Sequence, residues 1–144
     1  MTRALRSSYA DGEQINGDPP VYLFEDYLSR EQCTHLIELS EPHMRRAVVS
    51  GGAEGVESEG RTGSVHWIQH NLTPITQSVS QRLADLVGIP LENAESIQVI
   101  NYGVGEQYKP HYDGWEHTTE TGQRCLARGG QRLLTCLIYL SDVD

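Results

Sequence analysis

Several features are scarce in this sequence, and each scarcity argues against a class of protein. No run of 18 apolar residues occurs among the 144, so we expect no membrane-spanning helix. The first residues are basic, but no apolar stretch follows them, which argues against a secretory signal. Lysine and arginine total 11 against 20 aspartates and glutamates, and the net charge of −9 disfavours binding to nucleic-acid phosphates.

Cysteine is sparse as well. The three residues, Cys33, Cys125 and Cys136, are widely separated, and no Cys-x-x-Cys pair offers a zinc or redox site. Cys33 and Cys136 lie in apolar patterns and are expected in the core, whereas Cys125 lies in a polar stretch and is expected to be a free thiol. Unpaired cysteines fit a reducing compartment, so we expect a cytoplasmic protein.

Two amphipathic helices are predicted. One begins after Ser29, which can form a capping box with Gln32, and it ends before Pro42. The other runs from Thr73, its cap, to the closing Gly88. Its buried stripe is expected at positions three or four apart: Ile75, Val79, Leu83 and Leu86.

Short strands are predicted around these helices. Residues 1–20 are polar and rich in turn formers, so we expect a flexible leader before a single domain portion at 21–144. The glycine-rich segments 50–65 and 114–130 are expected to be mobile loops, the second ordering over bound substrate as a lid. Apolar or alternating patterns predict strands at 21–24, at 96–102 and, buried, at 132–140, with a further extended run at 107–113. Helices followed by strands indicate an α+β fold with a sandwich-like or barrel-like sheet.

A His-Tyr-Asp triplet at positions 111–113 is the candidate for chemistry. On a strand, residues two apart share a face, so His111 and Asp113 would point together and Tyr112 away from them. One imidazole and one carboxylate, joined by a further histidine, form the facial triad of non-haem Fe(II) oxygenases. From the spacing alone, a hydrogen-bonded surface pair is the better interpretation.

The surroundings of the triplet resemble the prolyl 4-hydroxylases in three segments that agree in order and spacing. Residues 97–113, which end in Gln-Tyr-Lys-Pro-His-Tyr-Asp, resemble the segment that carries the first metal ligands, and residues 129–143 resemble the strand after it. Residues 61–63, Arg-Thr-Gly, precede Trp67 and resemble the Arg-Thr-Ser motif of the substrate loop, with glycine in place of the usual serine. The resemblance runs from about residue 21 to the end of the chain.

The resemblance implies an Fe(II)- and 2-oxoglutarate-dependent dioxygenase with a double-stranded β-helix fold, a distorted jelly roll, behind N-terminal supporting helices. It implies His111 and Asp113 as catalytic residues and iron ligands, and Tyr102 and Thr135 as contacts to 2-oxoglutarate. It also implies O2 as a substrate, ascorbate as a supporting reductant, and a peptide or protein substrate hydroxylated at proline. Four residues would lie along the peptide groove: Arg61, Glu95, Tyr108 and Arg132.

Other interpretations are open. Tyr102 and Thr135 are also compatible with strand residues packed in a core, and Arg132 with a solvated cation at a strand end. A distal histidine and the basic residue that pairs with 2-oxoglutarate are expected beyond Asp144, so we expect a fragment that is inactive alone; completion of the site by a partner is the alternative. The alternative function is a non-catalytic peptide- or metal-binding domain of the same fold. A zinc hydrolase is less consistent, because no His-Glu-x-x-His occurs. The sequence indicates neither the substrate's identity nor the oligomeric state.

Overall fold

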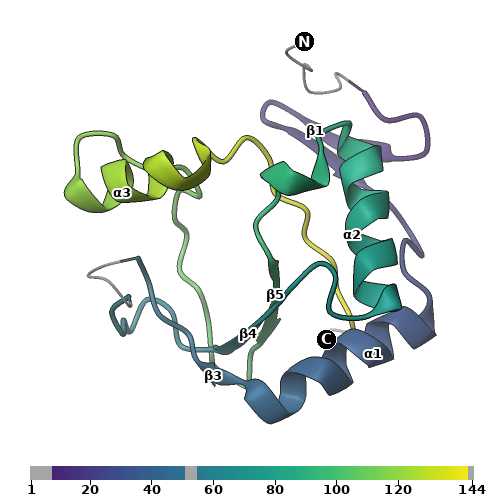
Figure 1. The fold of residues 1–144 in the computed structure, drawn as a ribbon, viewed down its shortest axis with the longest axis horizontal. Coiled ribbons are helices and arrows are strands. Elements are labelled where there is room, and N and C mark those ends of the chain that lie inside the picture. Colours follow the sequence, from purple (N-terminus) through teal and green to yellow (C-terminus); the bar gives the residue numbers. More distant parts are fainter. Residues whose placement is uncertain (1–7, 51–54, 143–144) are drawn as a thin grey trace. The chain divides into compact units, whose positions relative to one another are not determined.

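The computed structural model describes residues 8–50 and 55–142, whose contacts form two compact units (Figure 1). The first unit takes its described residues from the chain up to Glu38, from Ile68–Ile97 and from Leu140 onwards, and the second comprises Leu39–Trp67 and Gln98–Tyr139. The described residues form two small sheets and three α-helices, which confirms an α+β protein, and their strands close no barrel. Part of the loop predicted at 50–65 falls on 51–54, outside the described residues.

The first unit opens with a hairpin of two strands. Strand β1, Glu13–Gly17, pairs antiparallel with β2, Pro20–Leu23, and Gly17 and Pro20 are the paired residues next to the turn. Strand β2 confirms the prediction at 21–24. Strand β1 was not predicted, and every one of its residues is exposed, so it carries no apolar alternation that a sequence pattern could reveal.

The two long helices begin and end as their capping residues predict. In α1, Arg30–Ser40, the Ser29 hydroxyl accepts from the Gln32 amide at 3.2 Å and the Gln32 side chain accepts from the Ser29 amide at 3.1 Å. In α2, Pro74–Val87, Thr73 forms the same reciprocal cap with the residue at the third helical position. Gly88 ends α2 with a φ of 74°, a left-handed conformation that favours glycine.

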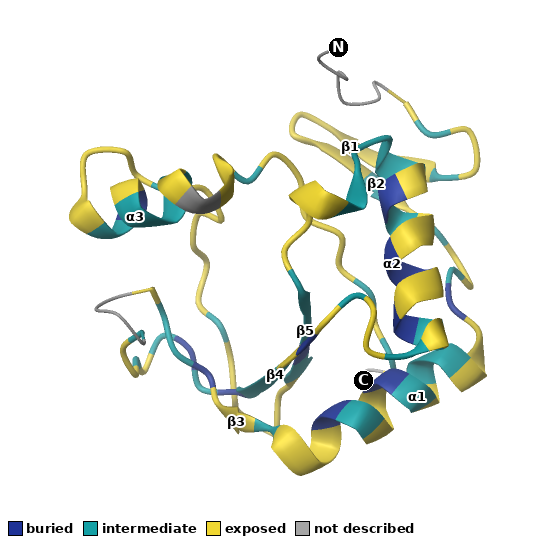
Figure 2. Ribbon diagram, in the orientation of Figure 1, coloured by how far each residue is buried: buried dark blue, intermediate teal, exposed yellow. Residues whose placement is uncertain are grey.

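The core of the first unit lies along these helices, whose buried positions are dark blue in Figure 2. Leu36 of α1 and Val79 of α2 are 2% and 1% exposed. The other buried positions of α2 are small side chains, Thr76, Ser80 and Ala84, while the predicted Ile75, Leu83 and Leu86 are only half-buried. A pattern of large apolar residues does not select these positions. A buried threonine is tolerated because its hydroxyl can bond locally, as Thr76 Oγ1 does to the Thr73 carbonyl at 2.9 Å.

No helix among the described residues has both the length and the apolar character needed to cross a bilayer. The longest, α2, has 14 residues. Short 3₁₀ turns follow the helices at Glu41–His43, behind α1, and Leu91–Asn93, behind α2.

A sheet of three strands in the order β3-β4-β5 lies almost entirely within the second unit. The strands are β3, Arg45–Arg46; β4, Ser64–Ile68; and β5, Ile97–Asn101. Strand β5 confirms the prediction at 96–102. The chain then turns as predicted, with Gly105 at φ 79° and the Glu106 amide donating to the Gly103 carbonyl at 3.0 Å.

Three expectations for the second unit are wrong. Residues 107–113 form no strand, and only Tyr108 makes an isolated bridge, to Arg61. Pro110 has no amide hydrogen to extend that pairing. The supposed loop at 114–130 contains helix α3, Glu120–Gly129, capped by Thr119. The glycines of that segment obscured a short run of good helix formers.

The third wrong expectation is the buried strand predicted at 132–140. Residues 131–140 have no strand assignment, and most of their side chains are exposed. A strand needs hydrogen bonds from a neighbour, and none of the described strands pairs with this segment. Cys136, expected in the core, is therefore exposed, while Cys33 and Cys125 are half-buried. The three thiols are all unpaired.

Candidate metal centre

The structure brings His111 and Asp113 together without a strand. His111 Nε2 lies 3.2 Å from Asp113 Oδ1. The other ring nitrogen, Nδ1, lies 2.8 Å from the carbonyl oxygen of Lys109, two residues earlier. The geometry therefore comes from a local turn of the chain around Pro110, although the predicted strand would also have put the two side chains on one side. Tyr112, between them, is 98% exposed.

The Lys109 carbonyl determines how the imidazole can act. A carbonyl only accepts hydrogen bonds, so Nδ1 carries the proton and, in a neutral ring, Nε2 presents its lone pair. Nε2 faces a carboxylate oxygen of Asp113. Two atoms that both present lone pairs repel each other unless a proton or a metal cation lies between them. Nitrogen and oxygen donors fixed in this way fit a divalent first-row metal, and the backbone bond is the outer partner that such histidines usually have.

His111 is the first of three stacked side chains. The imidazole is parallel to the Tyr108 ring, with centroids 3.6 Å apart and an interplanar angle of 20°. The Arg61 guanidinium lies 4.6 Å from the centroid of the same tyrosine ring. These predicted site residues are therefore in contact, although Arg61 was expected only along a substrate groove.

The Arg61 side chain is buried and hydrogen-bonded within the protein. It is 9% exposed, and its two terminal nitrogens donate to the Val48 carbonyl at 2.8 Å and to the Gln98 amide oxygen at 3.0 Å. Its Nε is buried and has no hydrogen-bond partner. Backbone bonds from Thr62 to Gln107 and from Lys109 to Gly60 tie the two segments together, which fixes Tyr108 opposite Arg61.

Asp113 has a second partner on the segment after α3. The Thr135 hydroxyl donates to Asp113 Oδ2 at 2.7 Å, so the two carboxylate oxygens have different neighbours. Arg132 Nη1 donates to the Asp113 backbone carbonyl at 3.3 Å, and its guanidinium lies 4.4 Å from the centroid of the Trp115 ring. The structure thus brings His111, Asp113, Tyr108, Arg61, Thr135 and Arg132 into one continuous set of contacts within the second unit.

The other two predicted site residues are Tyr102 and Glu95. Tyr102 follows β5, is 44% exposed and packs its ring over Gly63. A Cβ added to Gly63 would lie 2.6 Å from that ring and 2.8 Å from the Asn101 carbonyl oxygen, so only glycine fits. This explains locally why glycine stands where the resembling motif has serine. Glu95 is an exposed residue of the first unit, and its place in a groove stays a prediction.

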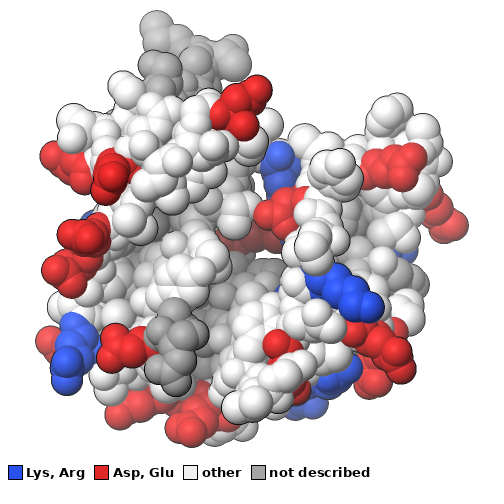
Figure 3. Space-filling model, turned by 180° about the vertical axis from the view of Figure 1, so that it is seen from behind, with Lys and Arg blue, Asp and Glu red and all other residues white. Residues whose placement is uncertain are grey.

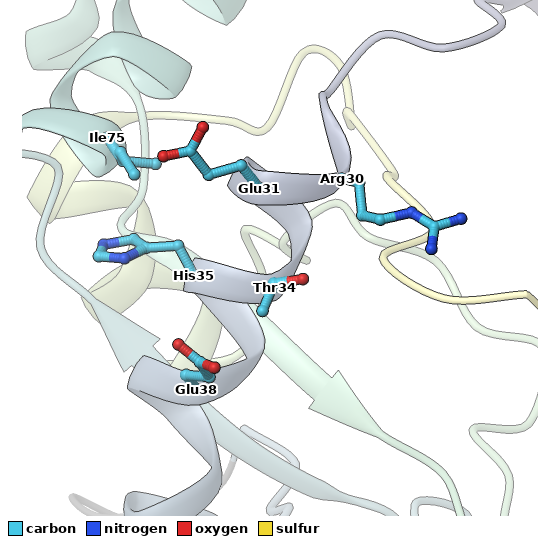
Figure 4. A pocket seen from close by; sticks show the side chains of 6 residues that line it. All are labelled: Arg30, Glu31, Thr34, His35, Glu38 and Ile75. Carbon is cyan, nitrogen blue, oxygen red and sulfur yellow. The ribbon is translucent and has the colours of Figure 1, made fainter.

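Two surface features lie apart from these residues. A pocket of about 500 Å³ in the first unit is lined by α1 side chains and by Ile75 (Figure 4), and none of the predicted site residues lines it. Figure 3 shows acidic side chains spread over one face with fewer basic ones between them, as the net charge of −9 requires. Within residues 8–50 and 55–142, no three histidine, cysteine or acidic side chains gather to hold a metal, so the pair at 111 and 113 is a partial ligand set there.

Comparison with known proteins adds an independent observation. No protein-family model matches the chain. Probable prolyl 4-hydroxylase 8 of Arabidopsis thaliana is 35% identical over 96% of this chain and 50% of its own length. Prolyl 4-hydroxylase 5 of the same plant is 36% identical over 92% of this chain and 44% of its own length, and prolyl 4-hydroxylase subunit alpha-3 of Rattus norvegicus is 34% identical over 92% and 24%.

The chain is prolyl 4-hydroxylase-like. The similarity covers nearly all of it, which confirms the resemblance drawn from the motifs. The chain spans half the length, or less, of these curated relatives.

Two residues of this prolyl 4-hydroxylase-like chain were missed by sequence reasoning. Gln131 Oε1 accepts from the Trp115 amide at 2.7 Å, and Gln131 Nε2 donates to the Trp115 carbonyl at 2.9 Å. The glutamine thereby joins the segment after Asp113 to the segment before Thr135. A polar residue between a glycine pair and an apolar run was the available signal, and it is a weak one.

Proposed function

We propose that the full-length protein containing this chain is an Fe(II)- and 2-oxoglutarate-dependent dioxygenase that hydroxylates a peptidyl proline. The observation that carries the proposal is the His111–Asp113 pair, 3.2 Å apart with Nδ1 tied to the backbone, in a chain similar to prolyl 4-hydroxylases over nearly its whole length. Nε2 and the carboxylate oxygen are two adjacent atoms that could share a divalent cation, as an iron site requires.

In this proposal, His111 Nε2 and Asp113 Oδ1 would hold Fe(II), and a third ligand would come from outside the described contacts. The bound iron would supply the activation of O2 that is coupled to 2-oxoglutarate oxidation, with the products succinate, CO2 and hydroxyproline. The chain's own residues hold the donor atoms. The Lys109 carbonyl fixes the tautomer of His111, and the Tyr108 ring fixes its plane.

The remaining predicted roles belong to the same proposal. Tyr102 would contact 2-oxoglutarate beside Gly63, and Tyr108 and Arg132 would present polar groups to a proline-containing peptide, with Arg61 behind Tyr108. The role of Glu95 in the peptide groove stays a prediction. We propose a jelly roll for the full-length enzyme, a cytoplasmic location on the strength of three unpaired thiols, and ascorbate as the reductant that restores Fe(II).

The experiment compares substitutions in the full-length protein. His111→Ala and Asp113→Ala should abolish hydroxyproline formation on a proline-rich peptide and weaken Fe(II) binding in anaerobic titration, because each removes a ligand. Asp113→Glu should fail too, because the extra methylene moves the carboxylate away from Nε2. The isolated 144-residue chain should form no succinate.

Tyr112→Phe and His117→Ala are the controls. Tyr112 is fully exposed and lacks a described contact, and His117 lies outside the set of contacts around Asp113, so both variants should retain iron and activity. Normal iron binding by both His111→Ala and Asp113→Ala would reduce the pair to a surface ion pair. Binding of iron and peptide without turnover by the full-length protein would favour the alternative, a non-catalytic binding domain.

A further inference from the structure

The two oxygens of the Asp113 carboxylate have different surroundings. Oδ1 faces His111 Nε2 at 3.2 Å, and Oδ2 accepts the Thr135 hydroxyl at 2.7 Å. The terminal torsion of aspartate is broad and nearly two-fold, so a carboxylate without an outer partner can exchange its oxygens or offer both of them to a cation. The Thr135 hydrogen bond removes that freedom and leaves Oδ1 as the oxygen beside the imidazole.

Thr135 is itself fixed relative to Asp113. Gln131 makes two hydrogen bonds to the Trp115 backbone, at 2.7 and 2.9 Å, and Arg132 bonds the Asp113 carbonyl while lying over the Trp115 ring. These contacts hold the segment before Thr135 against the segment after Asp113. The hydroxyl is therefore aimed by its own chain, without the support of a buried strand.

We propose that Thr135 is a positioning residue for the metal: its hydroxyl holds Asp113 as a ligand through Oδ1 alone. This inference rests on the proposed function, and it differs from the role that the resemblance implied, a direct contact to 2-oxoglutarate. A cosubstrate contact would affect 2-oxoglutarate binding. A positioning hydroxyl affects metal affinity even when no cosubstrate is present.

The test uses the full-length protein and two substitutions of opposite design. Thr135→Val keeps the shape and removes the hydroxyl, whereas Thr135→Ser keeps the hydroxyl and removes the methyl group. Binding of Mn(II), a redox-inert probe, is measured by calorimetry without 2-oxoglutarate, and the KM for 2-oxoglutarate is measured separately. Thr34→Val, at an exposed threonine of α1 in the other unit (Figure 4), is the matched control.

Thr135→Val should weaken Mn(II) binding roughly 10-fold, the lower end of the effect seen for lost outer partners of metal ligands. Thr135→Ser and Thr34→Val should bind Mn(II) as the unmodified protein does. Unchanged Mn(II) affinity of Thr135→Val, with a raised KM for 2-oxoglutarate, would overturn the inference and restore the cosubstrate contact. Equal weakening by the valine and serine variants would also overturn it, because the methyl group would then matter.

His111→Ala in the same titration separates the proposed metal site from the positioning role of Thr135. If it weakens Mn(II) binding and Thr135→Val does not, the inference fails and the proposed metal site stands. If His111→Ala has no effect on Mn(II) binding, the proposed function fails, and the role of Thr135 fails with it.

Discussion

The helices of the first unit and residues 131–139 of the second unit are both rich in apolar residues, yet they have opposite outcomes. Helices α1 and α2 bury Leu36 and Val79 almost completely. In residues 131–139, Leu133, Leu137 and Tyr139 are 66%, 71% and 68% exposed, and no strand forms.

The difference shows what each kind of structure needs. A helix satisfies its own backbone hydrogen bonds, and its ends need only local caps such as Thr73 and Gly88. A strand depends on a neighbour that the local sequence does not specify. Apolar residues therefore mark the buried face of α1 and α2 only at some positions, such as Leu36 and Val79, and fail to predict burial for residues 131–139.

The largest expected effect comes from matched leucine truncations. In the 144-residue chain, Leu36→Ala should lower the free energy of unfolding by roughly 2–5 kcal/mol, because it leaves a cavity in a closed core. Leu137→Ala should change it by no more than about 0.5 kcal/mol, as exposed side chains usually do. Denaturant titration of both variants measures the contrast. An equal loss in the two would show that residues 131–139 are packed.

The same two leucine variants can be compared in the full-length protein. If further strands of a jelly roll cover residues 131–139 there, Leu137→Ala should become costly, while the cost of Leu36→Ala should stay the same. No change in the cost of Leu137→Ala would contradict the proposed jelly roll.

A glycine substitution tests how closely the second unit is packed near the site. Gly63→Ala should lower the free energy of unfolding by about 1–3 kcal/mol, because the new Cβ would overlap the Tyr102 ring and the Asn101 carbonyl. Gly17→Ala is the control, since a Cβ at Gly17 has no atom within 4 Å. Thermal unfolding of the two variants gives the comparison, and a neutral Gly63→Ala would mean that Tyr102 is free to move aside.

Removing helix caps should have a smaller effect on stability, and the effect should differ between α2 and α3. Thr73→Ala should lower the free energy of unfolding by about 1 kcal/mol, because it removes a reciprocal cap from a helix with a buried face. Thr119→Ala removes a single cap bond from α3, whose side chains are mostly exposed or half-buried. We expect faster amide exchange confined to α3 and little change in global stability. A global loss equal to that of Thr73→Ala would argue against this.

The smallest effect concerns Cys136. Burial raises the pKa of its thiol, although the residue as a whole is exposed. A raised pKa lowers the thiolate fraction at a given pH, and the thiolate is the reactive form. Alkylation of Cys136 by iodoacetamide at pH 8 should therefore be slower in the native chain than in the unfolded chain, with the gap closing at higher pH. Mass spectrometry of the labelled peptide measures it, and equal rates would contradict the prediction.

The sequence predicts what depends on neighbours along the chain. Helix α2 and its caps, the box at Ser29 and the turn after β5 all rest on contacts within four residues. His111 and Asp113 do lie side by side, through a local turn of the chain and not through a strand face, and their role as metal ligands stays a prediction. What could not be predicted depends on distant segments: the Arg61–Tyr108 contact spans 47 positions, and the Thr135–Asp113 bond spans 22.

The stacking of Tyr108 on His111 gives the protein a built-in spectroscopic reporter. With centroids 3.6 Å apart, the carbon-bound protons of the imidazole lie in the shielding region of the tyrosine ring current. Their NMR resonances should be shifted upfield from those of an unstacked histidine and should move downfield whenever a bound peptide pulls Tyr108 away. If the proposed peptide substrate displaces Tyr108, its binding would therefore be visible on His111 itself, without any label and before a metal is added.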